Sequence, residues 1–250
     1  DFMMIEEVDE DATRSYYVNE RSLLESAFSD GAAAFAVNYD SSYFFYPFSA
    51  PHGKSLSGML TLSRFDMTES VRRSLPIEES LMKFVDLDRC YSVSRVEVSN
   101  GRELVLYTAH LSAYTSDGLI AEEQLRMLLD DMESEYNNGN YCICGGDFNK
   151  DLLGDSSKIF GISSDGYTWA QPFPESMVSG RPLAMIAPFD ENNPIPSCRN
   201  ADGPHNPGQF VVTVDGFIAS DNIEIVSSRV IDTGFVYSDH NPVELRFVMK

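Results

Sequence analysis

The spacing of hydrophobic and polar positions changes several times along the chain, and these changes predict a mixture of helices and strands. Residues 119–136 repeat apolar side chains at helical spacing opposite an acidic face, and they predict the clearest helix. Residues 19–28 show a second helical pattern. Short apolar or alternating runs between turn residues predict strands at 2–5, 31–40, 57–65, 141–146, 210–220 and the C-terminal end.

A hairpin is predicted within residues 90–111, where two alternating runs flank Asn100-Gly101, a dipeptide suited to a tight turn. Residues 150–209 are irregular and hold most of the prolines and the single tryptophan. Because no linker divides the chain, we expect one domain over residues 1–250. Predicted strands outnumber helices, which favours an α/β (α+β) fold of two packed sheets with helices outside.

The charge of the chain constrains its partners. The 39 acidic residues outnumber the 18 basic residues, and the net charge is −21. Long-range repulsion of this size opposes binding to an extended polyanion such as nucleic acid, although it does not exclude it. Hydrolysis of a small phosphate ester is compatible with it, because a bound metal ion can supply local positive charge.

The four cysteines do not follow a zinc-binding or disulfide pattern. Cys142 and Cys144 share one face of a predicted strand, and we interpret them as small core residues. No apolar run approaches the roughly 20 residues needed to cross a bilayer, so we expect no transmembrane segment. We expect a monomer, and the sequence does not indicate a compartment.

Polar groups follow several of the predicted strands. In "YCICGGDFNK", Asp147 and Asn149 come directly after a buried strand. Taken alone, the pair is typical of a turn, and it is equally compatible with the floor of an active site. Similar groups stand at or near other strand ends, and together these positions indicate a site for metal or phosphate: Glu7, His110, Asp147, Asn149, Asp215, Asp239 and His240.

Several segments resemble, in order, the motifs of the endonuclease/exonuclease/phosphatase superfamily, which has the deoxyribonuclease I-like fold. They are "IEEV", "YTAHL", "GGDFN", "VDGFIAS" and "SDHNPV", and "SGMLTLSRF" resembles a further strand of that family. The resemblance runs from residue 2 to about residue 248 and is poor over 150–209. It implies a four-layer sandwich of two mixed β-sheets packed face to face with helices outside. It also implies metal-dependent hydrolysis of a phosphate ester.

The resemblance also implies roles for particular residues. Glu7 corresponds to the metal-binding glutamate, and Glu6 stands where the family usually has glutamine. Asp147 corresponds to the aspartate that orients or deprotonates the attacking water. Asn149 corresponds to the amide that holds this water or a phosphoryl oxygen. His110 corresponds to a histidine that contacts the phosphate.

Three further positions complete the implied site. Asp215 resembles the aspartate that supports His110 or binds phosphate or metal nearby. Asp239 corresponds to the partner of the final histidine and is a candidate ligand of a second metal. His240 corresponds to the histidine whose imidazole contacts the scissile phosphate, held by Asp239 or another carboxylate.

The expected cofactor is Mg²⁺, with Mn²⁺ as a substitute, because hard cations prefer oxygen ligands and no His/Cys cluster indicates zinc. Arg64 and Arg199 are candidate substrate-binding residues, although a structural ion pair explains Arg64 equally well. The family's first strand, with its metal-site asparagine, has no counterpart before Asp1. We therefore expect the sequence to be part of a longer protein.

The fold does not determine the substrate, because the family includes nucleases, sphingomyelinases and inositol phosphatases. The leading hypothesis is a Mg²⁺-dependent phosphodiesterase or phosphatase acting on a small or lipid-linked phosphate ester. The first alternative is a metal-dependent endonuclease or exonuclease acting on DNA or RNA. The second is a catalytically silent phosphate-binding protein of the same fold. The aromatic residues 43–48 are candidates for stacking on a base or a lipid headgroup.

Overall fold

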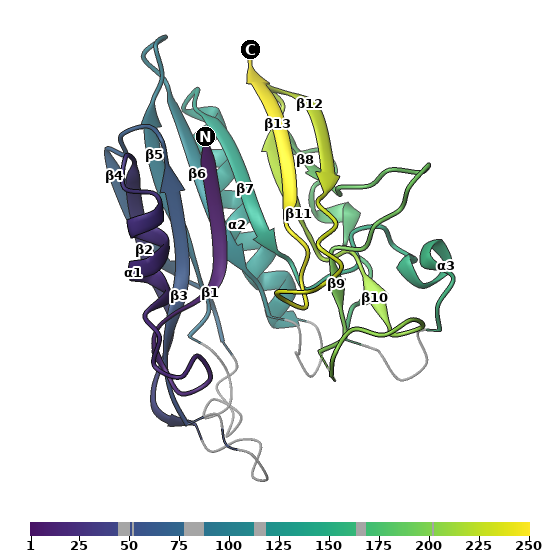
Figure 1. Cartoon of the computed structure of the whole chain (residues 1–250). Coiled ribbons are helices and arrows are strands. Elements are labelled where there is room, and N and C mark those ends of the chain that lie inside the picture. Colours follow the sequence, from purple (N-terminus) through teal and green to yellow (C-terminus); the bar gives the residue numbers. More distant parts are fainter. Residues whose placement is uncertain (45–50, 52, 78–87, 113–118, 164–168, 202) are drawn as a thin grey trace. The chain divides into compact units, whose positions relative to one another are not determined.

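The computed structural model describes residues 1–44, 51, 53–77, 88–112, 119–163, 169–201 and 203–250 (Figure 1). Most of the aromatic stretch 43–48 lies outside these residues. The chain forms two compact units, Asp1–Gly146 and Asp147–Lys250. Within the described parts, no helix is long and apolar enough to span a membrane.

The first unit begins with a three-stranded antiparallel sheet in the order β1-β3-β2. Helix α1 lies against one face of this sheet, where Leu24 and Phe28 pack on a cluster around Leu60. Asn19 caps the helix by accepting a hydrogen bond from the main-chain nitrogen of Ser22, at 2.7 Å. The predicted helix and strands are therefore present, with bounds β1 Phe2–Ala12, α1 Glu20–Ala27, β2 Ala32–Phe44 and β3 Gly53–Ser63.

The second sheet of this unit contains strands β4, β5, β6 and β7 in sequential order. The predicted hairpin is confirmed, and its turn places Gly101 at a φ of 78°, which suits glycine. Helix α2 connects β6 to β7, and such a helical crossover is typical of parallel neighbours in a mixed sheet. The bounds are β4 Glu69–Ser74, β5 Cys90–Glu97, β6 Glu103–His110, α2 Leu119–Asn137 and β7 Tyr141–Asp147.

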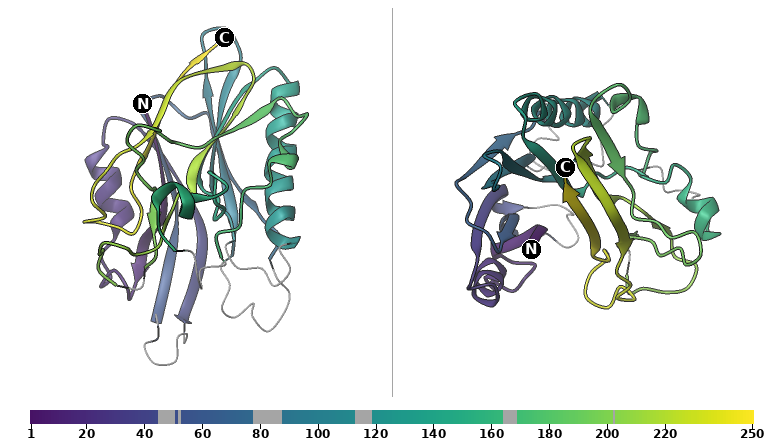
Figure 2. Two further views of the ribbon diagram at one scale, coloured as in Figure 1. Left: turned by 90° about the vertical axis from the view of Figure 1, so that its right-hand side faces the viewer. Right: turned by 90° about the horizontal axis from the view of Figure 1, so that it is seen from above.

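The two sheets of the first unit pack face to face, and a helix covers each outer face (Figure 2). Thr61 of β3 and Thr108 of β6 share a hydrogen bond of 2.7 Å between the sheets. On the α2 side, Tyr91 of β5 donates to Asp131 at 2.7 Å, and the Cys142 thiol donates to the carbonyl oxygen of Met132. The predicted fold class, an α/β sandwich of packed sheets with helices outside, is confirmed.

The second unit has shorter strands and longer loops. Its three antiparallel pairs are β8 with β11, β9 with β10, and β12 with β13. Phe210, Val212 and Val214 pack with Cys198 and Trp169 in a small core. The bounds are α3 Ser156–Phe160, η2 Glu175–Met177, β8 Leu183–Ile186, β9 Cys198–Arg199, β10 Val211–Val212, β11 Asp215–Ser220, β12 Ile223–Val230 and β13 Val243–Met249.

Several features of the second unit differ from the sequence prediction, and among them α3, β8 and β9 lie within residues 150–209, which were expected to be irregular. The predicted strand 210–220 is interrupted, because the main-chain nitrogens of Val214 and Asp215 donate to the Ser197 hydroxyl. Strand β12 was not predicted, since most of its residues are exposed or half-buried and give only a weak apolar pattern. The four cysteines are buried free thiols, which confirms the interpretation of Cys142 and Cys144 as core residues.

Candidate active site

Asp215 and His240 form the centre of a polar cluster in the second unit. Asp215 begins β11 and is 8% exposed. The imidazole Nδ1 of His240 lies 2.9 and 3.0 Å from the two oxygens of the Asp215 carboxylate. Ser197 donates to the same carboxylate at 2.6 Å. The carboxylate therefore fixes the orientation of the histidine ring.

This pairing determines the charge of His240. Burial of the imidazole lowers its pKa, but the negative charge and hydrogen bond of Asp215 raise it more. The pKa of His240 consequently lies well above the ordinary 6.5. The imidazolium form is favoured at neutral pH, with one proton on Nδ1 toward Asp215.

The other ring nitrogen of His240 faces a cysteine. Its Nε2 lies 3.5 Å from the Cys198 sulfur, and Cys198 and His240 also form an isolated β-bridge. Burial raises the pKa of the Cys198 thiol to about 11. Cys198 is therefore a neutral thiol in direct contact with the histidine.

Asp147 joins this cluster from the end of β7. The ligand atoms of Asp147, Asp215 and His240 all lie within 4.8 Å of one another, which is close enough to share one metal ion. Asp147 is 7% exposed, and its carboxylate accepts a hydrogen bond from the Asn149 main-chain nitrogen at 2.7 Å. Asn149 has a φ of 50°, so the segment is a turn as well as part of the cluster.

Main-chain hydrogen bonds hold the Asp147 turn against the segment before β11. The nitrogen of Phe148 donates to the carbonyl oxygen of Val214 at 3.1 Å, and that of Leu152 donates to Thr213 at 2.9 Å. These bonds bring Asp147 close to Asp215, although 68 positions of sequence separate them. These backbone hydrogen bonds make the "GDFN" and "VDG" segments neighbours in space.

Asp239 and Arg199 are joined through their backbones, since the Arg199 nitrogen donates to the Asp239 carbonyl oxygen at 2.9 Å. The Asp239 carboxylate accepts a weak hydrogen bond from Ser238 at 3.4 Å. The partner of His240 is thus the other carboxylate that the sequence analysis allowed, Asp215. The Arg199 guanidinium binds the carbonyl oxygens of Asn200 and Gly203, so it stabilises its own loop.

The remaining predicted residues belong to the first unit. Glu7 lies in a bulge of β1 with a φ of 56°, and its 55% exposed carboxylate binds Arg14 at 2.7 Å. His110 ends β6 and is 5% exposed. Arg64 is exposed, and its main-chain nitrogen binds the carbonyl oxygen of Asp1.

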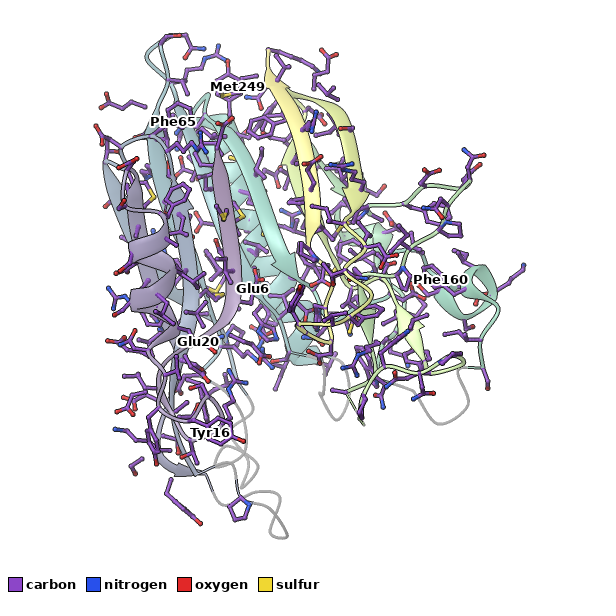
Figure 3. The ribbon with its side chains drawn as sticks, viewed as in Figure 1. Glu6, Tyr16, Glu20, Phe65, Phe160 and Met249 are labelled. Carbon is purple, nitrogen blue, oxygen red and sulfur yellow. The ribbon has the colours of Figure 1, made fainter. Side chains whose placement is uncertain are left out.

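Glu6, which stands where the family usually has glutamine, lies on β1 and is labelled in Figure 3. A Cβ atom on Gly146 would lie 3.0 Å from a Glu6 carboxylate oxygen and 1.9 Å from the carbonyl oxygen of Ala109. A larger residue therefore could not replace Gly146 without displacing the backbone of β6.

Sequence reasoning missed Ser197 and Cys198 as parts of the cluster. Ser197 directly precedes the two-residue strand β9 and Cys198 begins it, within an irregular segment, and neither residue belongs to a recognisable motif. Their contribution comes from tertiary contacts: Ser197 binds Asp215 and two main-chain nitrogens, and Cys198 contacts His240.

Comparison with known proteins identifies the family. The model of the "Endonuclease/Exonuclease/phosphatase family" matches residues 1–240. No curated protein matches the chain significantly. Among solved structures, an endonuclease/exonuclease/phosphatase from Beutenbergia cavernae DSM 12333 is similar at 21% identity and a TM-score of 0.69, over 100% of this chain and 62% of that chain. The chain thus spans less than two thirds of the length of that protein.

Two further solved structures show the same fold. ANGEL2, a 2′,3′-cyclic phosphatase, is 14% identical with a TM-score of 0.61, over 99% of this chain and 81% of that chain. D. rerio TDP2, complexed with a single-strand DNA product, is 15% identical with a TM-score of 0.61, over 100% of this chain and 86% of that chain. Members of the matched family are hydrolases that act on phosphoester bonds. The match over residues 1–240 shows that this chain belongs to the endonuclease/exonuclease/phosphatase family.

Proposed function

We propose that this chain is a metal-dependent phosphoesterase that hydrolyses a small or lipid-linked phosphate ester by in-line attack of an activated water. The observation that supports this most strongly is the grouping of Asp147, Asp215 and His240, with ligand atoms within 4.8 Å. The grouping combines a general base, a cationic acid and a carboxylate that orients it. The negative charge of −21 favours a small substrate over a long polyanion.

The donor set fits a divalent cation. Carboxylate oxygens are the preferred ligands of Mg²⁺, and Mn²⁺ accepts the same ligands. We propose Glu7 and Asp239 as the ligands, and the exposed carboxylate of Glu7 is accessible to an ion. A bound cation neutralises the charge of the phosphate and polarises a phosphoryl oxygen.

We assign the other roles in the reaction to side chains of this protein. Asp147 orients the attacking water and accepts its proton, and Asn149 holds the water or a phosphoryl oxygen. His240 donates a hydrogen bond from its cationic ring to a phosphoryl oxygen, while Asp215 keeps the ring in place. His110 contacts the phosphate from the end of β6.

Two arginines are proposed to contribute to substrate binding. Arg64 is exposed and can contact an anionic substrate. Arg199 acts by ordering its loop, since its guanidinium already binds two carbonyl oxygens of that loop. Loops of this kind carry specificity in many enzymes.

A metal-dependent nuclease is the second candidate function. It is favoured by the similarity of fold to TDP2, which was observed with a single-strand DNA product. The charge of the chain opposes it, because phosphate-backbone binding depends on basic residues that neutralise the polyanion.

The test compares two substrates with and without Mg²⁺. We expect Mg²⁺-dependent hydrolysis of bis-p-nitrophenyl phosphate, loss of activity with EDTA, and no nicking of plasmid DNA. Replacing Asp147→Asn or His240→Ala should lower turnover by at least about 10²-fold with the fold retained. Asp190→Asn, an exposed loop carboxylate, is the matched control and should leave turnover unchanged.

Other outcomes would decide between the alternatives. Nicking of plasmid DNA at low salt, with little hydrolysis of the small ester, would support the nuclease. Inactivity on a panel of phosphate esters, with phosphate still bound, would support the catalytically silent binding protein. Near-wild-type turnover in either active-site variant would contradict the proposed roles.

A further inference from the structure

Arg14 is a cationic side chain to which the proposed hydrolysis gives no role. It lies in the turn that follows β1, and Tyr16 marks this turn in Figure 3. The main-chain nitrogen of Tyr17 donates to the carbonyl oxygen of Ala12 at 2.9 Å, so the turn folds back on the strand. The guanidinium consequently contacts residues of β1, and the Arg14 side chain remains 40% exposed.

A buried carboxylate fixes the orientation of this guanidinium. Nε of Arg14 donates to the two Asp9 oxygens at 3.0 and 3.1 Å, and Nη2 donates to one of them at 2.9 Å. The Asp9 side chain is 3% exposed. An arginine that binds a carboxylate through two nitrogens gains geometric specificity as well as energy. Asp9 therefore holds one edge of Arg14 in a defined place.

The other edge of the guanidinium faces Glu7. Nη1 donates to the Glu7 carboxylate at 2.7 Å, and Nη2 donates to the carbonyl oxygen of the same residue at 3.2 Å. Unlike that of Asp9, the carboxylate of Glu7 is 55% exposed, and it is a proposed metal ligand. Arg14 and a divalent cation repel each other and compete for this carboxylate.

A phosphate group suits the edge of Arg14 that Glu7 occupies. The planar fork of a guanidinium matches the oxygens of a phosphate as well as those of a carboxylate. A cation on Glu7 attracts the anionic substrate to the side of the residue that Arg14 contacts. The contacts to Asp9 do not involve Nη1, so Arg14 can exchange the Glu7 carboxylate for a phosphate oxygen without leaving Asp9.

We propose that Arg14 binds the phosphate of the substrate and that Asp9 is the positioning residue that holds Arg14 for this purpose. When Glu7 binds a divalent cation, Arg14 releases the carboxylate and donates from Nη1 to a phosphate oxygen. Only hydrogen bonds change in this exchange. The proposal rests on the proposed function for the identity of the substrate, whereas the binding of inorganic phosphate tests it without turnover.

The direct test measures the affinity for inorganic phosphate by isothermal titration calorimetry, with saturating Mg²⁺. Arg14→Ala should weaken phosphate binding at least about 10-fold, because a hydrogen bond between charged groups is lost. Arg14→Lys should also weaken it, since an ammonium keeps the charge but lacks the fork that contacts Asp9 and phosphate together.

Arg21→Ala is the matched control. It removes the same charge from a side chain that is 35% exposed and pairs with Glu10 and Glu25. We expect phosphate affinity to remain unchanged in this variant. Equal affinities in Arg14→Ala and Arg21→Ala would overturn the proposal, as would a wild type that binds no phosphate in the presence of Mg²⁺.

Further variants separate phosphate binding from folding, which thermal unfolding followed by circular dichroism reports. Arg14→Ala removes a partner of the buried Asp9 carboxylate, and such a loss can destabilise the fold. The double variant Arg14→Ala/Asp9→Asn removes the buried charge as well and should bind phosphate as weakly as Arg14→Ala. Asp9→Asn alone retains the arginine, and we expect several-fold weaker phosphate binding. Wild-type affinity in a folded double variant would overturn the proposal.

Metal binding without phosphate gives a second readout. Because Arg14 competes with the cation for Glu7, Arg14→Ala should raise the affinity for Mn²⁺ several-fold more than Arg21→Ala does. An arginine that only ordered Glu7 would have the opposite effect, since its loss would weaken Mn²⁺ binding. Weaker Mn²⁺ binding in Arg14→Ala would therefore overturn the exchange.

An activity measurement then separates this proposal from the proposed function. With bis-p-nitrophenyl phosphate, Arg14→Ala should raise KM at least about 10-fold and change kcat much less, because the lost contact is made before and during the reaction. If the wild type binds phosphate but hydrolyses nothing, the proposed function fails and the role of Arg14 in phosphate binding stands. If it hydrolyses the ester and Arg14→Ala binds phosphate equally well, the hydrolysis stands and the role of Arg14 falls.

Discussion

Two of the predicted site residues have an unusual backbone conformation. Glu7 and Asn149 have φ values of 56° and 50°, in the left-handed region that non-glycine residues seldom occupy. Each such residue costs of order 1–3 kcal/mol, and these conformations concentrate at functional sites. This strain is an independent reason to retain Glu7 as a proposed metal ligand.

The first prediction at this scale concerns Glu7 and the metal. The carboxylate of Glu7 is exposed and forms an ion pair with Arg14. Ion pairs between exposed groups are weak, so Glu7 can exchange Arg14 for a metal ion. Replacing Glu7→Gln removes the charge that attracts a divalent cation. We expect Mn²⁺ affinity, measured by electron paramagnetic resonance of the free ion, to fall at least about 10-fold.

Glu10→Gln is the matched control for this measurement. Glu10 lies on the same strand and also pairs with an arginine, Arg21, at 3.3 Å. We expect Mn²⁺ affinity to remain unchanged in this variant. Equal losses in both variants would mean that the effect is one of general charge, and an unchanged affinity in Glu7→Gln would remove Glu7 from the proposed ligands.

At the scale of elements, helix α2 is attached to the sheet of the first unit by an ion-pair network. Arg95 of β5 binds Glu135 of α2 with a hydrogen bond of 2.5 Å, and it also binds Glu103 and Glu69. The hydrogen bond from Arg95 lowers the pKa of Glu135, and burial opposes this only in part. A carboxyl whose pKa is lowered on folding stabilises the protein above its unfolded pKa and loses that effect as the pH falls.

This network gives a pH-dependent prediction. At pH 7, Glu135→Gln should lower the free energy of unfolding by about 1–2 kcal/mol, because a charged hydrogen bond between partly buried groups is lost. The difference from the wild type should shrink as the pH falls below 4.5, the ordinary pKa of the group, since the unfolded wild-type carboxyl then takes up a proton and the folded carboxyl follows at lower pH. Urea denaturation at pH 7 and at pH 3.5–4.5 measures both quantities.

Glu123→Gln is the control for this prediction. It removes another α2 carboxylate, whose pair with Arg126 is 3.5 Å long with both side chains more than half exposed. We expect a change of less than about 0.5 kcal/mol at any pH, as for most exposed pairs. A pH-independent loss in Glu135→Gln would show that packing, and not charge, holds the helix end.

The sequence predicted the elements whose patterns are local. The 119–136 stripe corresponds to α2, the helical pattern of residues 19–28 corresponds to α1, and the Asn100-Gly101 turn joins β5 and β6. It did not predict the interruption before β11, because a hydroxyl distant in sequence, that of Ser197, takes the main-chain hydrogen bonds. A local sequence pattern carries no information about a hydrogen bond between residues so far apart in sequence.

The candidate site shows the same limit. The motifs around Asp147, Asp215 and His240 were visible as polar groups after apolar runs, so three members of the cluster could be named in advance. The sequence alone did not decide whether Asp239 or another carboxylate pairs with His240. Asp239 is adjacent to His240 in sequence, but folding brings Asp215 to the ring instead. The contact between Cys198 and Nε2 of His240 depends on the folded structure, because 42 positions separate the two residues in sequence.

At the scale of the whole molecule, the charge of −21 is the property most relevant to the choice of substrate. At about 10 mM salt the Debye length is about 30 Å, so the charges of the chain act together on a polyanion. At about 150 mM the length falls to about 8 Å, and only local charges remain effective. Proteins that bind nucleic acid through basic residues show the opposite trend, with affinity falling steeply as salt rises.

The final prediction follows from this difference. We expect a fluorescent single-stranded oligonucleotide to bind weakly at about 10 mM salt and several-fold more tightly at about 150 mM, because screening reduces repulsion from the acidic chain. The KM for bis-p-nitrophenyl phosphate, which carries a single charge, should change less over the same range. Fluorescence anisotropy and initial rates measure these quantities, and a steep loss of oligonucleotide affinity with salt would indicate a basic binding track and favour the nuclease.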